Sequence, residues 1–260
     1  MTISTTYTTL LEARGLGLGF PSGIQALRGL DLRVEEGEFL SLVGPSGCGK
    51  SSFLRLVAGL LPPTEGELTL GGMEPSQARR TSHSCGFVFQ APTLLPWRNV
   101  LDNLVLPLEL DGLAPSERLG RAVEWLERVG LTDFGKAWPA QLSGGMRMRV
   151  SIARALASRP RILLMDEPFA ALDDITRGRL QEDLLRLRRE IGFTTVFVTH
   201  NVSEAVFLSD RVAVMSGRPG RINGEVAIGF GPSRDAELRG EAAFAAQVRE
   251  VGHLLRESGE

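Results

Sequence analysis

The feature that most constrains the fold is a glycine-rich loop around residue 48. The loop consists of Gly44-Pro45-Ser46-Gly47-Cys48-Gly49-Lys50-Ser51-Ser52 and fits the pattern G-x-x-x-x-G-K-[ST], the P-loop. Residues 38–43, an apolar run of strand length, precede it, and apolar residues recur at helical spacing after it: Phe53, Leu54, Val57 and Leu61. A strand that leads through such a loop into a helix points backbone N–H groups and the helix N-terminus at one position, which binds phosphate.

The composition of the loop predicts how a nucleotide is held. The glycines let the backbone approach an anion, Lys50 can reach the β- and γ-phosphates, and Ser51 can place its hydroxyl on Mg²⁺. We therefore assign all nine residues to nucleotide binding. The alternative, a glycine-rich turn without a ligand, is disfavoured because the chain carries its positive charge almost entirely on arginine and yet has Lys50 here.

Length and composition narrow the class of protein. A chain of 260 residues with 43% hydrophobic content can form one large domain or two modest ones around a real core. The net charge of −2 gives no footprint for nucleic acid, and two cysteines are too few for a disulfide framework. Residues 1–6 have no feature of a signal peptide, and no apolar run approaches the roughly 18 residues of a membrane span. We therefore expect that, if the protein acts at a membrane, it binds to the membrane surface and does not span it.

The order of apolar patterns predicts an α/β fold. Strands are predicted at residues 11–20, 30–34, 67–70, 85–90, 161–165, 193–199, 211–215 and 221–226. Between residues 99 and 158 the period is helical, and a further helix stops at Gly192. Because strands and helices alternate, the sheet is expected to be mostly parallel. An amphipathic helix near the C-terminus, with Phe244, Val248, Val251 and Leu255 on one face, is expected to pack on the core.

Two carboxylates follow the buried-type strand that ends near Met165. We expect this strand to lie beside the P-loop strand, so that Asp166 can hold Mg²⁺ directly or through water. Glu167 would then face the γ-phosphate and orient the attacking water. The alternative is an acidic turn after a strand, which the upstream P-loop disfavours.

Five further motifs lie in a fixed order around the P-loop. They are Gln90, Leu142-Ser143-Gly144-Gly145-Met146, Asp166-Glu167, Ala171-Leu172-Asp173 and His200 with its strand. With them the chain resembles an ABC-transporter nucleotide-binding subunit from Leu11 to Val226. The resemblance implies a P-loop NTPase fold with a RecA-like core of mostly parallel sheet, an N-terminal antiparallel β-subdomain and an inserted helical subdomain. It places the core at residues 11–90 and 158–226, the helical subdomain at 91–157, and a C-terminal helical tail at 227–260.

The resemblance assigns a second anion-binding segment to Ser143, Gly144 and Gly145. These residues open a helix, so N–H groups, a hydroxyl and a helix dipole point the same way. The family relationship implies that this signature presses on the γ-phosphate of ATP bound to the other protomer of a head-to-tail dimer.

The resemblance also assigns roles to four single residues. It implies that Gln90 touches Mg²⁺ and links the site to the helical insert, and that Asp173 lies at the dimer seam. His200 is placed as the switch histidine that contacts the γ-phosphate, and Phe20 as the aromatic that stacks on adenine. The alternatives are a strand-end histidine with a satisfied hydrogen bond and a core phenylalanine. The expected catalytic set is thus Lys50, Gln90, Glu167 and His200, and the expected metal set is Ser51, Gln90 and Asp166.

Three stretches are similar to the nitrate, sulfonate, taurine and bicarbonate importer branch: residues 90–100, 169–173 and 202–211. The resemblance implies a peripheral ATPase on the cytoplasmic face of the membrane. Its partners would be a permease that contacts Gln90–Trp97, a second copy of the chain and, indirectly, a solute-binding protein. The alternative for Leu94, Leu95 and Trp97 is that they fill the core of the insert itself.

Two other classes of function remain alternatives. A soluble ABC ATPase of DNA repair or translation usually has tandem cassettes or a long coiled-coil insert, whereas only about fifty residues separate Gln90 from the signature. A non-hydrolysing regulatory module would lack the catalytic carboxylate, and Glu167 is present. Cys48 is also open to two interpretations: a reactive thiol, activated by Lys50 and the helix N-terminus, or a buried and inert one.

Overall fold

The structure, a computed structural model, describes residues 8–80 and 84–258. Residues 1–6, for which no signal peptide is predicted, lie outside these ranges. Three strands near the N-terminus form an antiparallel sheet in the order β2-β1-β4. They are β1 (Thr9–Gly19), β2 (Gln25–Glu35) and β4 (Glu65–Leu70). The predicted antiparallel subdomain is therefore present, with a second strand longer than the sequence pattern indicated.

The second sheet has six strands in the order β5-β6-β7-β3-β8-β9. The first five are parallel, and β9 runs antiparallel to β8. The strands are β3 (Phe39–Val43), β5 (Cys85–Val88), β6 (Ile162–Asp166), β7 (Thr194–Val198), β8 (Arg211–Met215) and β9 (Ile222–Ala227). This arrangement confirms the predicted α/β class with a mostly parallel sheet.

One prediction about the sheet is wrong. The strand that ends in Asp166 does not lie beside the P-loop strand β3, because β7 lies between them. All five residues of β7 are buried, so this strand needs neighbours on both edges and cover on both faces. The central position of the sheet supplies both. No local pattern distinguishes the order of these strands, because β3, β6 and β7 are all short and apolar.

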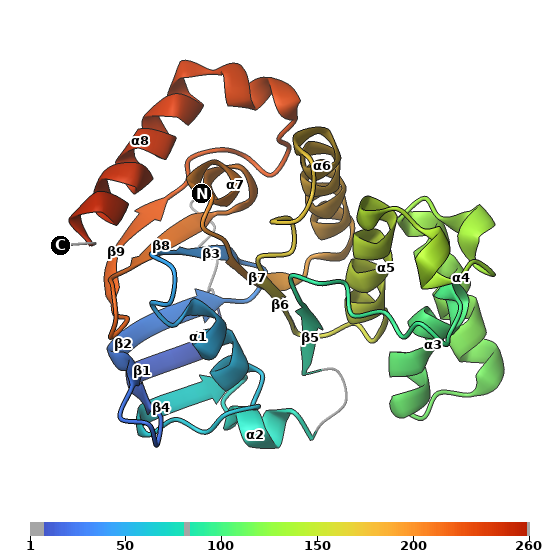
Figure 1. The fold of residues 1–260 in the computed structure, drawn as a ribbon, viewed down its shortest axis with the longest axis horizontal. Coiled ribbons are helices and arrows are strands. Elements are labelled where there is room, and N and C mark those ends of the chain that lie inside the picture. The colour runs from blue at the N-terminus through green and yellow to red at the C-terminus, as the bar shows by residue number, and fades with distance from the viewer. Residues whose placement is uncertain (1–7, 81–83, 259–260) are drawn as a thin grey trace, which may run out of the picture.

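The apolar strands separate two cores. Phe39, Met165 and Phe197 belong to a core that lies against most of the helices. Leu40, Leu164 and Val198 belong to a second core, which contains α1 (Lys50–Val57) and the antiparallel sheet. Alternate residues of a strand point to opposite faces, so strands with continuous apolar sequence supply both cores. Figure 1 shows the antiparallel sheet below the parallel sheet, and α6 and α7 on the opposite side of the parallel sheet.

The helical segment between β5 and β6 forms one end of the molecule (Figure 1). It contains α3 (Val100–Leu110), α4 (Pro115–Arg128), η1 (Thr132–Phe134), η2 (Pro139–Gln141) and α5 (Gly144–Ala157). Its last helix also contacts the sheet, since a Cβ atom on Gly86 of β5 would lie 2.5 Å from the carbonyl oxygen of Ala155. The remaining helices are α2 (Pro75–Ala78), α6 (Asp174–Ile191), α7 (Val202–Leu208), η3 (Ala236–Gly240) and α8 (Ala242–Glu257).

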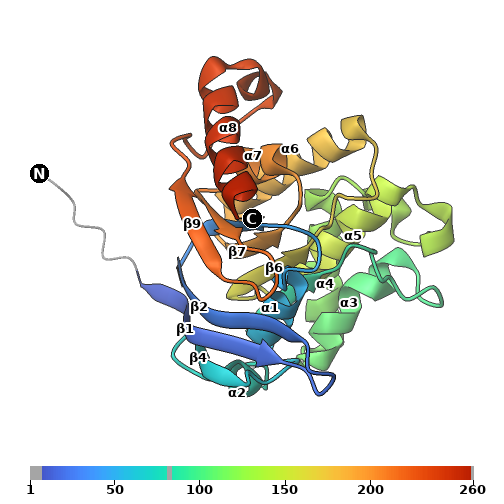
Figure 2. The ribbon, with the colours of Figure 1, turned by 60° about the vertical axis from the view of Figure 1, so that its left-hand side comes forward.

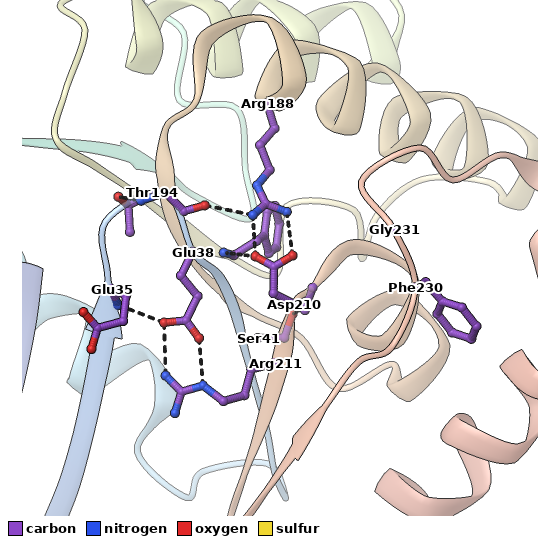
Figure 3. A network of polar contacts seen from close by, with 12 residues as sticks. Glu35, Glu38, Ser41, Arg188, Thr194, Asp210, Arg211, Phe230 and Gly231 are labelled. Carbon is purple, nitrogen blue, oxygen red and sulfur yellow. Dashed lines mark hydrogen bonds and ion pairs between the residues drawn. The ribbon is translucent and has the colours of Figure 1, made fainter. Parts of the chain in front are cut away.

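A polar network fixes the amino edge of the parallel sheet (Figure 3). Asp210 pairs with Arg188 of α6 and accepts a hydrogen bond from the backbone N–H of Phe39 at 2.9 Å. Next to it, Glu38 binds Nε of Arg211 at 2.7 Å. These contacts tie the starts of β3 and β8 to the end of α6, so the strands begin in register.

The C-terminal residues pack on the core, as the amphipathic pattern predicts. Phe244 and Val251 of α8 are buried, and the helix lies along β9 (Figure 2). Arg234 is also buried, and its guanidinium donates to carbonyl oxygens at the end of α7, including Ser209 O at 2.8 Å. At the other end of α8, Ser258 O accepts a hydrogen bond from Gly217 N at 3.1 Å. Within the described ranges, none of the helices combines the length and the apolar composition that a membrane crossing requires.

Candidate nucleotide-binding site

The candidate site is built at the carboxyl edge of the parallel sheet. Val198 of β7 pairs with Leu42 of β3 on one side and with Asp166 of β6 on the other. The three strands therefore end at the same level, although β6 and β3 are not neighbours. The P-loop, the two carboxylates and His200 all follow within a few residues of this edge.

The P-loop has the backbone conformation that its glycines allow. Gly47 has a φ of 75° and Gly49 a φ of 108°, in the region that L-residues rarely adopt. A Cβ atom on Gly49 would also lie 2.7 Å from Cδ2 of Leu27, so a larger residue would collide with β2. The buried ammonium of Lys50 donates to Gly44 O at 2.7 Å and to Pro45 O at 3.0 Å. This contact places the lysine charge inside the curve of the loop.

The two cysteines are both poorly suited to nucleophilic chemistry. Cys48, within the loop, is fully buried, with Sγ 3.7 Å from the Lys50 ammonium. This burial favours the inert-thiol interpretation over the reactive one. Burial also raises the pKa of the Cys85 thiol to about 12.

Ser51 and Asp166 meet although 115 residues separate them. The serine hydroxyl donates to Oδ1 of Asp166 at 2.9 Å. Burial raises the pKa of the Asp166 carboxyl, while the bond from Ser51 opposes that shift. A carboxylate and a hydroxyl side by side are the oxygen donors that Mg²⁺ takes from proteins, with phosphate oxygens and water completing its shell. The pair therefore fits the metal that the sequence predicts here.

Glu167 is held in a strained backbone conformation beside His200. Its φ of 46° is unusual for a residue with a side chain, and its N–H donates to Val198 O at 2.9 Å. Nδ1 of His200 lies 2.9 Å from Oε2 of Glu167, and the histidine side chain is 61% exposed. Strain of this kind persists where the surrounding structure enforces it, which is common at functional sites.

The signature residues are not brought to this edge. Ser143 caps its own helix, since Oγ accepts a hydrogen bond from Met146 N at 3.2 Å. Gly145 is buried against α6, where a Cβ atom would lie 2.6 Å from Cγ2 of Thr176. Figure 1 shows α5 on the far side of β6 from α1. The neighbours of Ser143 and Gly145 thus belong to α5 and α6 rather than to the P-loop.

The other predicted residues lie at the margins of the site. Gln90 is exposed two residues after β5. Phe20 is 37% exposed at the tip between β1 and β2, so it is no core residue. Asp173 is exposed and caps α6; the hydrogen bond from Thr176 N, at 2.9 Å, lowers the pKa of its carboxyl.

The segment after Gln90 is partly exposed and partly packed on the core. Trp97 is 70% exposed, whereas Leu94 packs against the core of the helical segment. Two residues that the sequence reasoning missed hold its backbone. The buried Asn103 donates to Leu95 O at 3.2 Å, and Arg154 donates to Thr93 O at 3.0 Å. Nothing local marks these residues, because their partners are 8 and 61 positions away.

A second missed pair links the segment Ala171-Leu172-Asp173 to the end of β7, just before His200. Arg177 of α6 donates to Leu172 O at 2.8 Å, and its Nε lies 3.4 Å from Oε1 of Glu204. Glu204 accepts a 2.7 Å hydrogen bond from Thr199, which precedes His200. Burial raises the pKa of the Glu204 carboxyl.

Comparisons with known proteins agree with these features. Residues 27–170 match the ABC transporter family. The aliphatic sulfonates import ATP-binding protein SsuB 1 of Xanthomonas axonopodis pv. citri is 48% identical over 199 residues, which is 76% of this chain and 78% of that protein. The nitrate import ATP-binding protein NrtD of Synechocystis sp. is 40% identical over 248 residues, 92% of this chain and 91% of its own length.

A solved structure supports the same conclusion. The ATP-binding cassette MJ0796, dimeric and bound to ADP and Pi in a post-hydrolysis state, superimposes with a TM-score of 0.74. It is 36% identical and covers 85% of this chain and 100% of its own. The chain therefore belongs to the ABC transporter family, as an ATP-binding ATPase with the α/β P-loop fold that its motifs predict.

Proposed function

We propose that the chain is the ATP-hydrolysing subunit of an importer for a small anion of the sulfonate or nitrate type. Two side-chain contacts at the carboxyl edge of the parallel sheet carry this proposal. Ser51 donates to Asp166, and Glu167 contacts His200. A subunit that only bound nucleotide would not need the second pair. The relatives named for sulfonate and nitrate import support the class of cargo.

In the proposed site, the nine P-loop residues hold the phosphates and Phe20 stacks on adenine. Ser51, Asp166 and Gln90 would hold Mg²⁺, which supplies charge neutralisation on the phosphates. Glu167 orients the attacking water, and His200 contacts the γ-phosphate. The 2.9 Å contact between these two side chains lets each fix the other's position.

We further propose that Ser143, Gly144 and Gly145 act on nucleotide held by a second copy. Ser143 and Gly145 contact α5 and α6 rather than their own P-loop, and the three residues open a 14-residue helix whose N-terminus favours an anion. A head-to-tail dimer would bring them to the partner's nucleotide, with Asp173 at the seam. The dimeric cassette structure is consistent with such an assembly.

The permease contact is proposed in a groove between the core and α3. This groove, of about 730 Å³, is lined by exposed apolar side chains that include Leu60, Phe89 and Leu110. Its lining residue Phe89 directly precedes Gln90, and the exposed Trp97 follows in the same segment. We propose that a permease helix binds here, at the cytoplasmic face of the membrane, and that a solute-binding protein delivers the cargo.

We also propose a division of the chain into three parts. They are the nucleotide-binding core (residues 11–90 and 158–226), the helical subdomain (91–157) and the C-terminal tail (227–260).

Co-purification and reconstitution test this function. The chain should co-purify with its permease from detergent-solubilised membranes, and Leu110→Arg should abolish this without loss of ATPase activity. Leu119→Arg, at an exposed leucine of α4 outside the groove, is the matched control. Vesicles containing both subunits and the solute-binding protein should take up a labelled sulfonate or nitrate only with ATP. Hydrolysis that no membrane partner stimulates would instead favour the soluble ABC ATPase.

A further inference from the structure

We propose that Arg218 is a positioning residue for ATP binding, which acts by orienting the P-loop peptide between Gly47 and Cys48. The inference rests on the nucleotide site proposed above. Arg218 lies in the turn between β8 and β9, and 171 residues separate it from Gly47. No motif of the sequence assigns a role to this turn.

Arg218 grips a single carbonyl of the P-loop with two donors. Its Nε and Nη2 lie 3.0 Å and 2.9 Å from Gly47 O. A Cβ atom on Gly47 would lie only 3.0 Å from Nη2, so the guanidinium is also packed against the loop backbone. Hydrogen bonds from a charged donor are stronger than those between neutral groups.

The planarity of the peptide bond converts this grip into an orientation. In a trans peptide, the carbonyl and the following N–H point in opposite directions. When Arg218 holds Gly47 O on the outer side of the loop, the N–H of Cys48 must point inward. That N–H donates to Pro45 O at 3.3 Å, the same carbonyl that accepts from the Lys50 ammonium, so a phosphate oxygen bound here would take the place of Pro45 O as its acceptor. The guanidinium charge further polarises the peptide and makes the N–H a better donor to phosphate.

The turn that carries Arg218 is itself held against the P-loop and β2. A Cβ atom on Gly220 would lie 2.1 Å from Cys48 O, so only glycine permits this approach. Gly220 N donates to Ala26 O at 2.8 Å, and Arg28 N donates to Gly220 O at 3.2 Å. Arg218 therefore projects from a fixed support, which is what a positioning residue requires.

A second arginine in the turn distinguishes an effect of the hydrogen bonds to Gly47 O from an effect of positive charge alone. Arg221 is exposed and lies three residues after Arg218. If Arg218 acted only by adding positive potential near the triphosphate, Arg221 would contribute a comparable effect. If the hydrogen bonds to Gly47 O matter, Arg218 alone should affect binding.

The experiment is an equilibrium titration of the purified full chain with ATP, paired with steady-state kinetics. Arg218→Gln should weaken ATP affinity by roughly three- to tenfold, because an exposed charge-assisted grip is lost. KM should rise in proportion, while kcat at saturating ATP stays within about twofold. Arg218→Lys, which keeps the charge but not the two-donor geometry, should recover only part of the affinity. Arg221→Gln should bind ATP within about twofold of the wild type.

Three results would overturn the proposal. They are wild-type affinity in Arg218→Gln, an equal loss in Arg221→Gln, and a fall of Tm in the nucleotide-free Arg218→Gln protein by more than about 3 °C, which would indicate a general structural role. Lys50→Ala in the same titration tests the nucleotide site on which the inference rests. If Lys50→Ala still binds ATP normally, the proposed nucleotide site is wrong. If Lys50→Ala loses ATP binding but Arg218→Gln binds ATP normally, only the inference about Arg218 is wrong.

Discussion

The carboxyl edge of the parallel sheet and the start of α5 differ in how their functional groups are satisfied. At the sheet edge, side chains from distant segments meet in pairs: Ser51 with Asp166, and Glu167 with His200, each at 2.9 Å. At the start of α5, the Ser143 hydroxyl serves only its own helix. The first region is assembled within one chain, and the second presents a surface. This contrast is what a shared site between two copies requires, and the following experiments test it.

The largest effect is expected at Glu167. Glu167→Gln removes the carboxylate that we propose orients the attacking water but keeps the size of the side chain, so turnover should fall by about 10²-fold or more while ATP affinity stays within a few fold. Steady-state hydrolysis and ATP titration measure the two quantities. Glu237→Gln, in the exposed stretch before α8, is the control and should be unaffected. Unchanged hydrolysis in Glu167→Gln would remove the residue from the mechanism.

Mixing two inactive variants tests whether the two regions act across chains. Lys50→Ala should abolish the phosphate grip and Ser143→Arg should block closure, so either homodimer should be inactive. Random pairing of equal amounts makes about half of the dimers mixed, each with one whole site and one doubly damaged site. If sites act independently, hydrolysis should return to roughly a quarter of the wild-type rate.

Cross-linking covers the case in which both sites must be intact for turnover. ATP should then promote cross-links between the two variants in the mixture more than in either variant alone. If neither hydrolysis nor cross-linking exceeds that of the separate variants, the shared-site mechanism is refuted.

The contrast between the regions also shows what could be predicted from sequence. Sequence patterns identify the P-loop, Asp166 and Glu167, because glycine spacing and a strand followed by carboxylates are local features. The strand order could not be read in this way, and β6 was wrongly expected beside β3. Pairing among equally apolar strands depends on which strand is covered on both faces, which is a property of the whole fold.

The missed residues have a common cause. Arg177 and Glu204 lie on different helices, and Arg218 reaches the P-loop across 171 positions. An arginine on an amphipathic helix or in a turn looks like a solvated charge until its carbonyl partners are known. Such residues belong to no motif of fixed spacing, so sequence analysis could not detect them.

A tenfold effect is expected at the rim of the assembled region. Phe20→Ala should weaken ATP affinity by roughly tenfold, because stacking of a base on an aromatic ring is lost. Phe20→Trp should retain affinity. Ile24→Ala, which removes an exposed apolar side chain from the same turn, is the control. Equal affinity in Phe20→Ala and the wild type would show that adenine binds elsewhere.

The smallest effect concerns how the α5 region is attached to the core. Gly145→Ala places a Cβ atom 2.6 Å from Cγ2 of Thr176 and should lower the free energy of unfolding by about 1 kcal/mol. Thr176→Ser deletes that methyl group and should rescue the variant in urea unfolding. The double variant should even gain from the better helix propensity of alanine. Lack of rescue would mean that Gly145 is required for another reason.

The hydrogen bond between Gly217 N and Ser258 O has a practical consequence for anyone who purifies this protein. Ser258 lies two residues from the end of the sequence, and Gly217 adjoins the arginine that grips the P-loop. An affinity tag fused directly after Ser258 would therefore act on the far end of a short chain of contacts that leads to the nucleotide loop. We expect a tag at that end to perturb apparent ATP affinity, which proteolytic removal of the tag should restore.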